Sequence, residues 1–111
     1  MNRIKLIAVF IANISNAVVH DILEISINSE ELRKHYDMEC SNFIKISKFY
    51  RDKINPAELP LPSKDAKKIR GKIKRNVFNE LNLRISNGYQ NIDLGLVDEH
   101  IDKRLKEMKV T

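Results

Sequence analysis

The sequence of 111 residues contains one cysteine, three glycines, three prolines and no tryptophan, and these scarcities exclude several kinds of site. Cys40 alone cannot form a disulfide within the chain, and one thiol cannot build a zinc or iron–sulfur cluster. The glycines, Gly71, Gly88 and Gly95, do not have the spacing of a phosphate-binding loop. We therefore expect no disulfide framework, no thiolate metal centre and no glycine-rich nucleotide site.

Histidine is also scarce: His20, His35 and His100 are spread along the chain, and none has the spacing of metal ligands. No nucleophile with a neighbouring base and no pair of carboxylates forms a recognisable catalytic motif. The sequence therefore predicts a non-enzymatic protein with no metal, no cofactor and no small-molecule substrate.

Long apolar runs are missing as well. The longest, Leu6 to Ala12, is too short to cross a bilayer. Arg3 and Lys5 precede this run as basic residues precede the apolar part of a signal peptide, but no small-residue cleavage site follows. Together with the single cysteine, this favours a cytoplasmic protein that does not bind a membrane.

The composition itself is typical of a folded chain. Hydrophobic residues make up 42% and charged residues 32%, so there is enough apolar surface to offset the entropy lost on folding. A length of 111 residues is near the common size of one domain. We expect a single domain over residues 1–111.

Apolar residues recur at steps of three and four in four segments, which predicts four helices. Ser29 and Ser63 are typical N-cap residues, and Asn87-Gly88 is a typical helix end. The expected helices cover about 2–28, 30–54, 64–87 and 94–109, with a proline-containing linker at 55–62. The predicted fold class is all-α, as a four-helix antiparallel bundle or a pair of helical hairpins. The alternative is a helical domain with a short N-terminal strand, because residues 3–14 are rich in β-branched side chains.

The first predicted helix is apolar nearly all round its first turns, unlike the second, whose outer face carries charged residues such as Lys48, Arg51 and Asp52. An all-round apolar helix needs cover on more than one side. It is therefore either the central helix or part of a contact between two copies. The sequence predicts a homodimer, whose interface would comprise Ile4, Ile7, Phe10 and Ile11.

The positive charge is concentrated in residues 63–88, where eight lysines and arginines against two acids give a net charge of +6, compared with +5 for the whole chain. Seven of these cations lie within twelve residues: Lys64, Lys67, Lys68, Arg70, Lys72, Lys74 and Arg75. At about 100° per residue they lie opposite Ile69, Ile73 and Val77, so we expect all seven to face solvent. Such an arc can follow a DNA or RNA backbone, and the absence of aromatic residues among the cations indicates little sequence specificity.

The alternative for this basic face is a solvated surface with no ligand. The protein would then act as an interaction or assembly subunit that binds another protein. The two functions predict different results when the lysines are replaced by glutamate, because only the first needs their charge.

Overall fold

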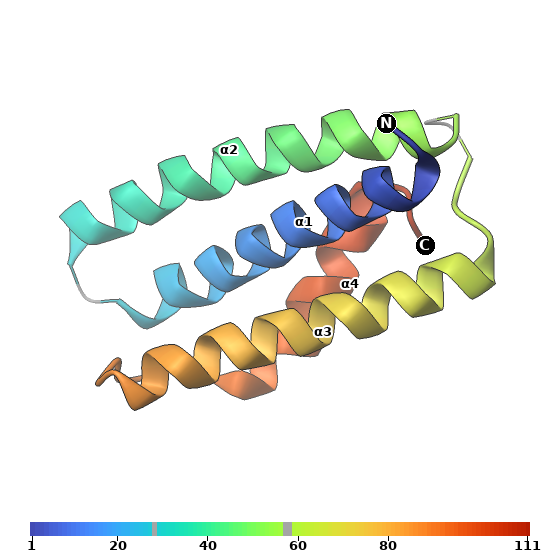
Figure 1. Cartoon of the computed structure of the whole chain (residues 1–111). Coiled ribbons are helices and arrows are strands. Elements are labelled where there is room, and N and C mark those ends of the chain that lie inside the picture. Colours follow the sequence, from blue (N-terminus) through green and yellow to red (C-terminus); the bar gives the residue numbers. More distant parts are fainter. Residues whose placement is uncertain (28, 57–58) are drawn as a thin grey trace.

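The computed structural model describes residues 1–27, 29–56 and 59–111 (Figure 1). The helices are α1 (Arg3–Ser26), α2 (Glu30–Ile54), α3 (Ser63–Ser86) and α4 (Val97–Glu107), and a 3₁₀ turn, η1 (Leu94–Leu96), precedes α4. No strand occurs in the described residues, so the all-α prediction is confirmed. The alternative with an N-terminal strand is wrong, since residues 3–14 belong to α1.

The predicted helix bounds agree with these to within about two residues for the first three helices. The segment predicted as one helix over 94–109 is instead η1 followed by α4, which ends at Glu107. Residue 28, the predicted end of the first helix, and residues 57–58 of the predicted linker lie outside the described residues.

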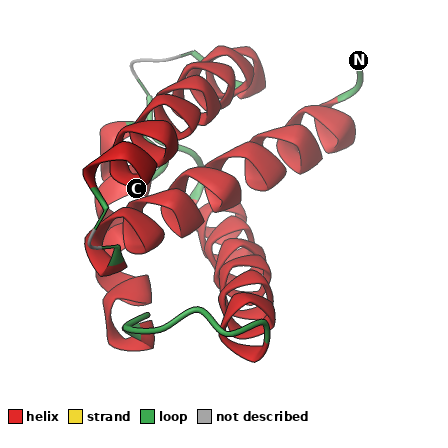
Figure 2. Ribbon diagram, turned by 90° about the vertical axis from the view of Figure 1, so that its left-hand side faces the viewer, coloured by secondary structure: helices red, strands yellow, loops and turns green. Residues whose placement is uncertain are grey.

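Consecutive helices run antiparallel, and α1 is the central one (Figure 1). It contacts each of the other three helices, which explains why its sequence is apolar on several sides. Phe10, Ile14, Val18 and Leu23 are completely buried along it. Figure 2 shows that the N-terminal turns of α1 extend away from the other helices.

By length and composition α1 could also cross a bilayer. Within the fold, 61% of its most apolar window is buried, and the core helices of soluble proteins satisfy the same criterion. The absence of a membrane partner therefore stays a prediction.

Local capping explains where most helices begin and end. The side chain of Asn2 accepts a hydrogen bond from Lys5 N, and Ser29 accepts one from Leu32 N. Ser63 does not cap α3 as expected; it is the first helical residue, and Pro62 stands at the cap position without a side-chain bond. Gly88 has φ +98° after the end of α3, where the left-handed conformation favours glycine.

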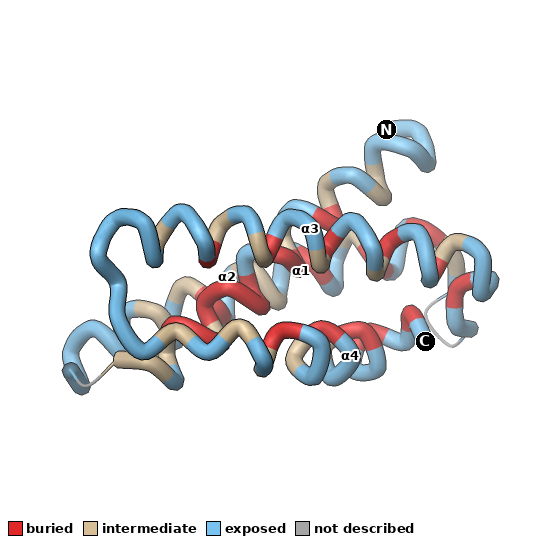
Figure 3. The backbone as a smooth tube through the Cα atoms, turned by 90° about the horizontal axis from the view of Figure 1, so that it is seen from below, coloured by how far each residue is buried: buried red, intermediate tan, exposed pale blue. Residues whose placement is uncertain are grey.

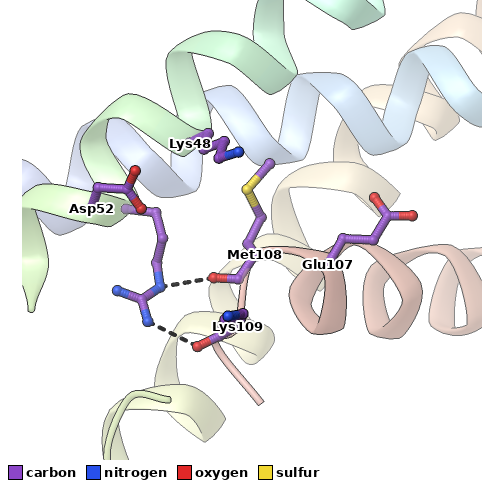
Figure 4. Close-up of a pocket in the computed structure, with 6 residues that line it drawn as sticks. Lys48, Asp52, Glu107, Met108 and Lys109 are labelled. Carbon is purple, nitrogen blue, oxygen red and sulfur yellow. Dashed lines mark hydrogen bonds between the residues drawn. The ribbon is translucent and has the colours of Figure 1, made fainter. Parts of the chain in front are cut away.

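One buried arginine ties the C-terminus to the rest of the fold. Arg51, which the sequence placed on the solvated face of the second helix, is only 1% exposed, so that expectation is wrong. Its Nε donates to Met108 O at 2.9 Å, and one of its terminal nitrogens donates to Lys109 O at 2.9 Å and Leu59 O at 2.6 Å. Figure 4 shows the bonds to the carbonyls of Met108 and Lys109. The other terminal nitrogen donates to the Asn55 side chain.

Candidate functional site

The seven predicted cations divide into two groups in the structure. Five of them are exposed and make no ion pair with any described residue. We call these five the cationic ridge: Lys64, Lys67, Lys68, Lys72 and Arg75. All five lie on the exposed part of α3, whose Ile69 and Ile73 are buried in the core.

The other two, Arg70 and Lys74, do not face solvent freely, which corrects the expectation for them. Arg70 Nε lies 2.7 Å from Asp102 Oδ1, and Arg70 also contacts Asp98 at 3.0 Å. Lys74 Nζ lies 3.1 Å from Asp98. The acids belong to α4 and are one turn apart, so both face α3. Their charges largely offset the two cations.

The pKa directions agree with this pairing. The hydrogen bond to Asp102 raises the pKa of Arg70. Hydrogen bonds from Lys74 and Arg70 lower the pKa of Asp98. Arg70 and Asp98 therefore stay charged at neutral pH, and the ion pairs fasten α3 to α4 rather than offering charge to a ligand.

The cationic ridge is continuous along the helix. From Lys64 to Arg75 it extends for roughly 16 Å at 1.5 Å per residue. The nearest acid on α3 is Asp65, whose carboxylate is 3.0 Å from the Arg3 guanidinium and so already has a cation partner. The ridge therefore keeps its full charge of five over about three helical turns.

The residues predicted for a dimer interface are also divided. Phe10 is 0% exposed and Ile11 is 6% exposed, because α1 buries them against the other helices of the same chain. Phe10 is therefore not available at the surface, which corrects its assignment to an interface, whereas Ile11 keeps a small exposed area. Ile4 is 80% exposed and Ile7 is half-buried. The homodimer itself stays a prediction.

The structure brings the scattered histidines next to acids. His20 Nδ1 donates to Asn16 O at 2.7 Å, and its Nε2 lies 2.6 Å from Glu39. His35 Nε2 lies 2.9 Å from the other oxygen of Glu39. In the part of the chain that the structure describes, no group of three or more His, Cys, Asp or Glu side chains could hold a metal ion.

A second polar cluster joins α1, α2 and α4, and no sequence pattern indicated it. Asp21 of α1 accepts two hydrogen bonds from Arg104 of α4, at 2.6 and 2.8 Å. The Cys40 thiol of α2 donates to the same carboxylate at 3.3 Å. Since both charged side chains are less than one-fifth exposed, this cluster orders the centre of the bundle.

The environment of Cys40 makes the thiol unreactive. Burial and the neighbouring Asp21 carboxylate raise its pKa from 9.0 to about 12. At pH 8 the folded thiol should therefore react with a disulfide reagent about a thousandfold more slowly than the unfolded one, because only the thiolate attacks. The measurement compares the rates with and without guanidinium chloride. Equal rates in the two states would contradict the buried, protonated thiol.

Comparisons with protein families, with curated proteins and with solved structures found no match for this chain. The functional assignment therefore depends on the residues and contacts described above.

Proposed function

We propose that this chain is a non-enzymatic protein that binds the phosphate backbone of DNA or RNA on the cationic ridge of α3. The observation that carries the proposal is that five exposed cations of α3 have no ion-pair partner among the described residues. Acids of α4 pair with two other cations of the same helix. A charged surface of this kind attracts polyanions and releases their counterions on binding.

The ridge supports contact with the backbone rather than with bases. It contains four lysines and one arginine, and residues 63–76 contain no aromatic side chain on which a base could stack. Lysine acts as a point charge, whereas reading a base edge needs a donor and acceptor pattern fixed in a groove. We therefore expect similar affinity for unrelated sequences.

The first test measures binding by fluorescence anisotropy with a labelled duplex, a single-stranded DNA and an RNA at 50 and 200 mM salt. If all five cations contact phosphates of a duplex, log Kd should change with log salt with a slope of about 4.5. The affinity should then fall about 500-fold between the two salt concentrations. If none of the three ligands binds at 50 mM salt, the proposal is wrong.

The second test separates the ridge from net charge. Replacing Lys64, Lys67 and Arg75 together by glutamate should weaken duplex binding more than about a hundredfold at 50 mM salt, because at least three phosphate contacts are lost. The matched control replaces three exposed lysines elsewhere, Lys45, Lys48 and Lys103, and changes the net charge equally. We expect less than a tenfold effect from the control. Equal losses in both variants would show that only overall charge matters.

A further inference from the structure

An apolar groove lies beside the cationic ridge, between the first turns of α1 and the first half of α3. It encloses about 240 Å³. Its apolar lining consists of Ile4, Ile7, Ala8, Ile11 and Ile69. A second hollow continues it along α3 and shares Ala8, Ile11 and Lys72 with it. The two hollows together follow α3 from Asp65 to Asn76, which is roughly 16 Å at 1.5 Å per residue.

The N-terminal end of this groove is open because α1 extends beyond the helices that cover it. Figure 3 shows the first turns of α1 standing away from the bundle and largely exposed. Ile4, at 80% exposure, is the most exposed of the isoleucines, leucines and phenylalanines in the described residues. A single exposed isoleucine is ordinary, but one that continues an apolar groove is typical of an interaction surface.

The rim of the groove is positively charged. Lys68 and Lys72 line it, and Arg75 lines its continuation. Among the described residues, Asp65 is the one acid of the lining, and the 3.0 Å ion pair with Arg3 occupies its carboxylate. An occupant therefore meets an aliphatic floor beside three cations that lack ion-pair partners in the described chain.

We propose that this groove binds an amphipathic helix of another protein, one with an apolar stripe and acidic residues along one flank. Three helical turns fit its length of roughly 16 Å, so apolar residues at i, i+3 or i+4, and i+7 reach the floor. Acidic side chains on the flank then lie next to Lys68, Lys72 and Arg75. This goes beyond nucleic-acid binding and gives the partner class for an interaction subunit.

Charge distinguishes this occupant from a second copy of the chain. In a symmetric dimer the same patch contacts itself, so Lys68, Lys72 and Arg75 would approach their own equivalents. Like charges at a contact oppose association, and in the described part of the chain the lining holds no unpaired acid to offset them. An acidic helix instead neutralises the rim.

The ridge and the groove share Lys68, Lys72 and Arg75, so an acidic helix and a nucleic acid should compete for the protein. The nucleic-acid proposal and the helix proposal can still be tested independently. Ile4 belongs to the groove alone, whereas Lys64 and Lys67 belong to the ridge without lining the groove. Ile4→Ser should therefore leave nucleic-acid binding unchanged, and Lys64→Glu with Lys67→Glu should leave helix binding nearly unchanged.

The test uses a fluorescein-labelled peptide of three heptads with leucines on one face and glutamates on its flank, and a second peptide with lysines in place of the glutamates. The full-length protein should bind the acidic peptide with micromolar affinity and the basic peptide at least tenfold more weakly. Ile4→Ser should weaken binding of the acidic peptide about tenfold or more, because the complex loses an isoleucine side chain that the peptide would bury. Lys68→Glu with Lys72→Glu should weaken it by a similar factor.

The matched control is Met38→Ser, since Met38 is 70% exposed on α2, away from the groove. It should bind the acidic peptide like the original protein.

The proposal is overturned if the acidic peptide does not bind, if the basic peptide binds equally well, or if Ile4→Ser has no effect. It is also overturned if light scattering finds a dimer that Ile4→Ser dissociates, since the groove would then hold a second copy. Binding to vesicles of anionic phospholipid in place of the peptide would assign it to a membrane and overturn it too.

Discussion

Arg51→Met is expected to lower the free energy of unfolding by about 3 kcal/mol or more, a large part of the stability of a domain this size. The guanidinium donates to the carbonyls of Met108, Lys109 and Leu59. Methionine fills a similar volume without a donor. The Met108 carbonyl is then left without a partner in a buried region, and the carbonyls of Lys109 and Leu59 in a partly buried one. Each loss costs about 1 kcal/mol or more.

The position of these carbonyls increases the effect. Met108 follows the last residue of α4, where the partial negative charge of the helix dipole is located. Burial lowers the pKa of Arg51, but an arginine stays protonated at neutral pH. Its charge therefore interacts favourably with the C-terminal end of α4, which takes the place of an acidic partner. The bond to Leu59 O also holds the linker at the same guanidinium.

Urea unfolding followed by circular dichroism measures this prediction. Arg51→Lys is the conservative variant, and we expect it to recover only part of the loss, because an ammonium cannot reach carbonyls on two segments at the same time. Lys48→Met, one turn earlier on the exposed surface of α2, is the matched control and should change stability by less than about 0.5 kcal/mol. An Arg51→Met protein as stable as the Lys48→Met control would show that the buried bonds contribute little.

Arg51 also shows where sequence patterns stop being informative. It lies one turn after Ser47, which belongs to the buried face, so it stands at the margin of the apolar stripe. A charge at such a margin is typical of solvated surfaces. Two of its partners are the carbonyls of Met108 and Lys109, which lie 57 and 58 positions further along the chain. Backbone carbonyls have no signature in the sequence. Only the tertiary fold reveals this contact.

The helices were predictable for the opposite reason, because their signals are local. Periodicity over neighbouring residues, Ser29 at a cap and Gly88 after α3 each act within one or two turns. The central place of α1 was one of two alternatives, since an all-round apolar helix can be covered by its own chain or by a copy. The burial of Phe10 and Ile11 within the chain decided that choice for those two residues.

The candidate site falls between these cases. Helical geometry placed the ridge lysines on the outer side of α3. The pairing of Arg70 and Lys74 depended on which helix lies next to α3, and that could not be derived from the pattern. Asp98 and Asp102, one turn apart on α4, were the available signal, because acids at this spacing present charge to a single neighbour.

Replacing only Arg104 of the Asp21–Arg104 pair is the second change for which we expect a large loss of stability. Arg104→Met removes two hydrogen bonds from the Asp21 carboxylate, which is 11% exposed. Among the described residues it then keeps only the Cys40 thiol at 3.3 Å and the more distant His100 Nδ1 at 3.9 Å. A buried charge left without a partner costs about 3–5 kcal/mol. The hydrogen bonds to Asp21 also raise the pKa of Arg104, as expected for a charged pair.

Removing both charges should be far less harmful than removing one. In Asp21→Leu with Arg104→Met no isolated charge remains and the volumes are similar, so we expect the double variant to be more stable than Arg104→Met by about 2 kcal/mol or more. A double-mutant cycle in urea gives the coupling energy directly. Arg104 also contacts the exposed Glu107 at 3.0 Å, and Glu107→Gln is the control for that weaker contact. If the double variant were as unstable as the sum of the single changes, the pair would not be coupled, and the loss would be due to altered packing around Cys40.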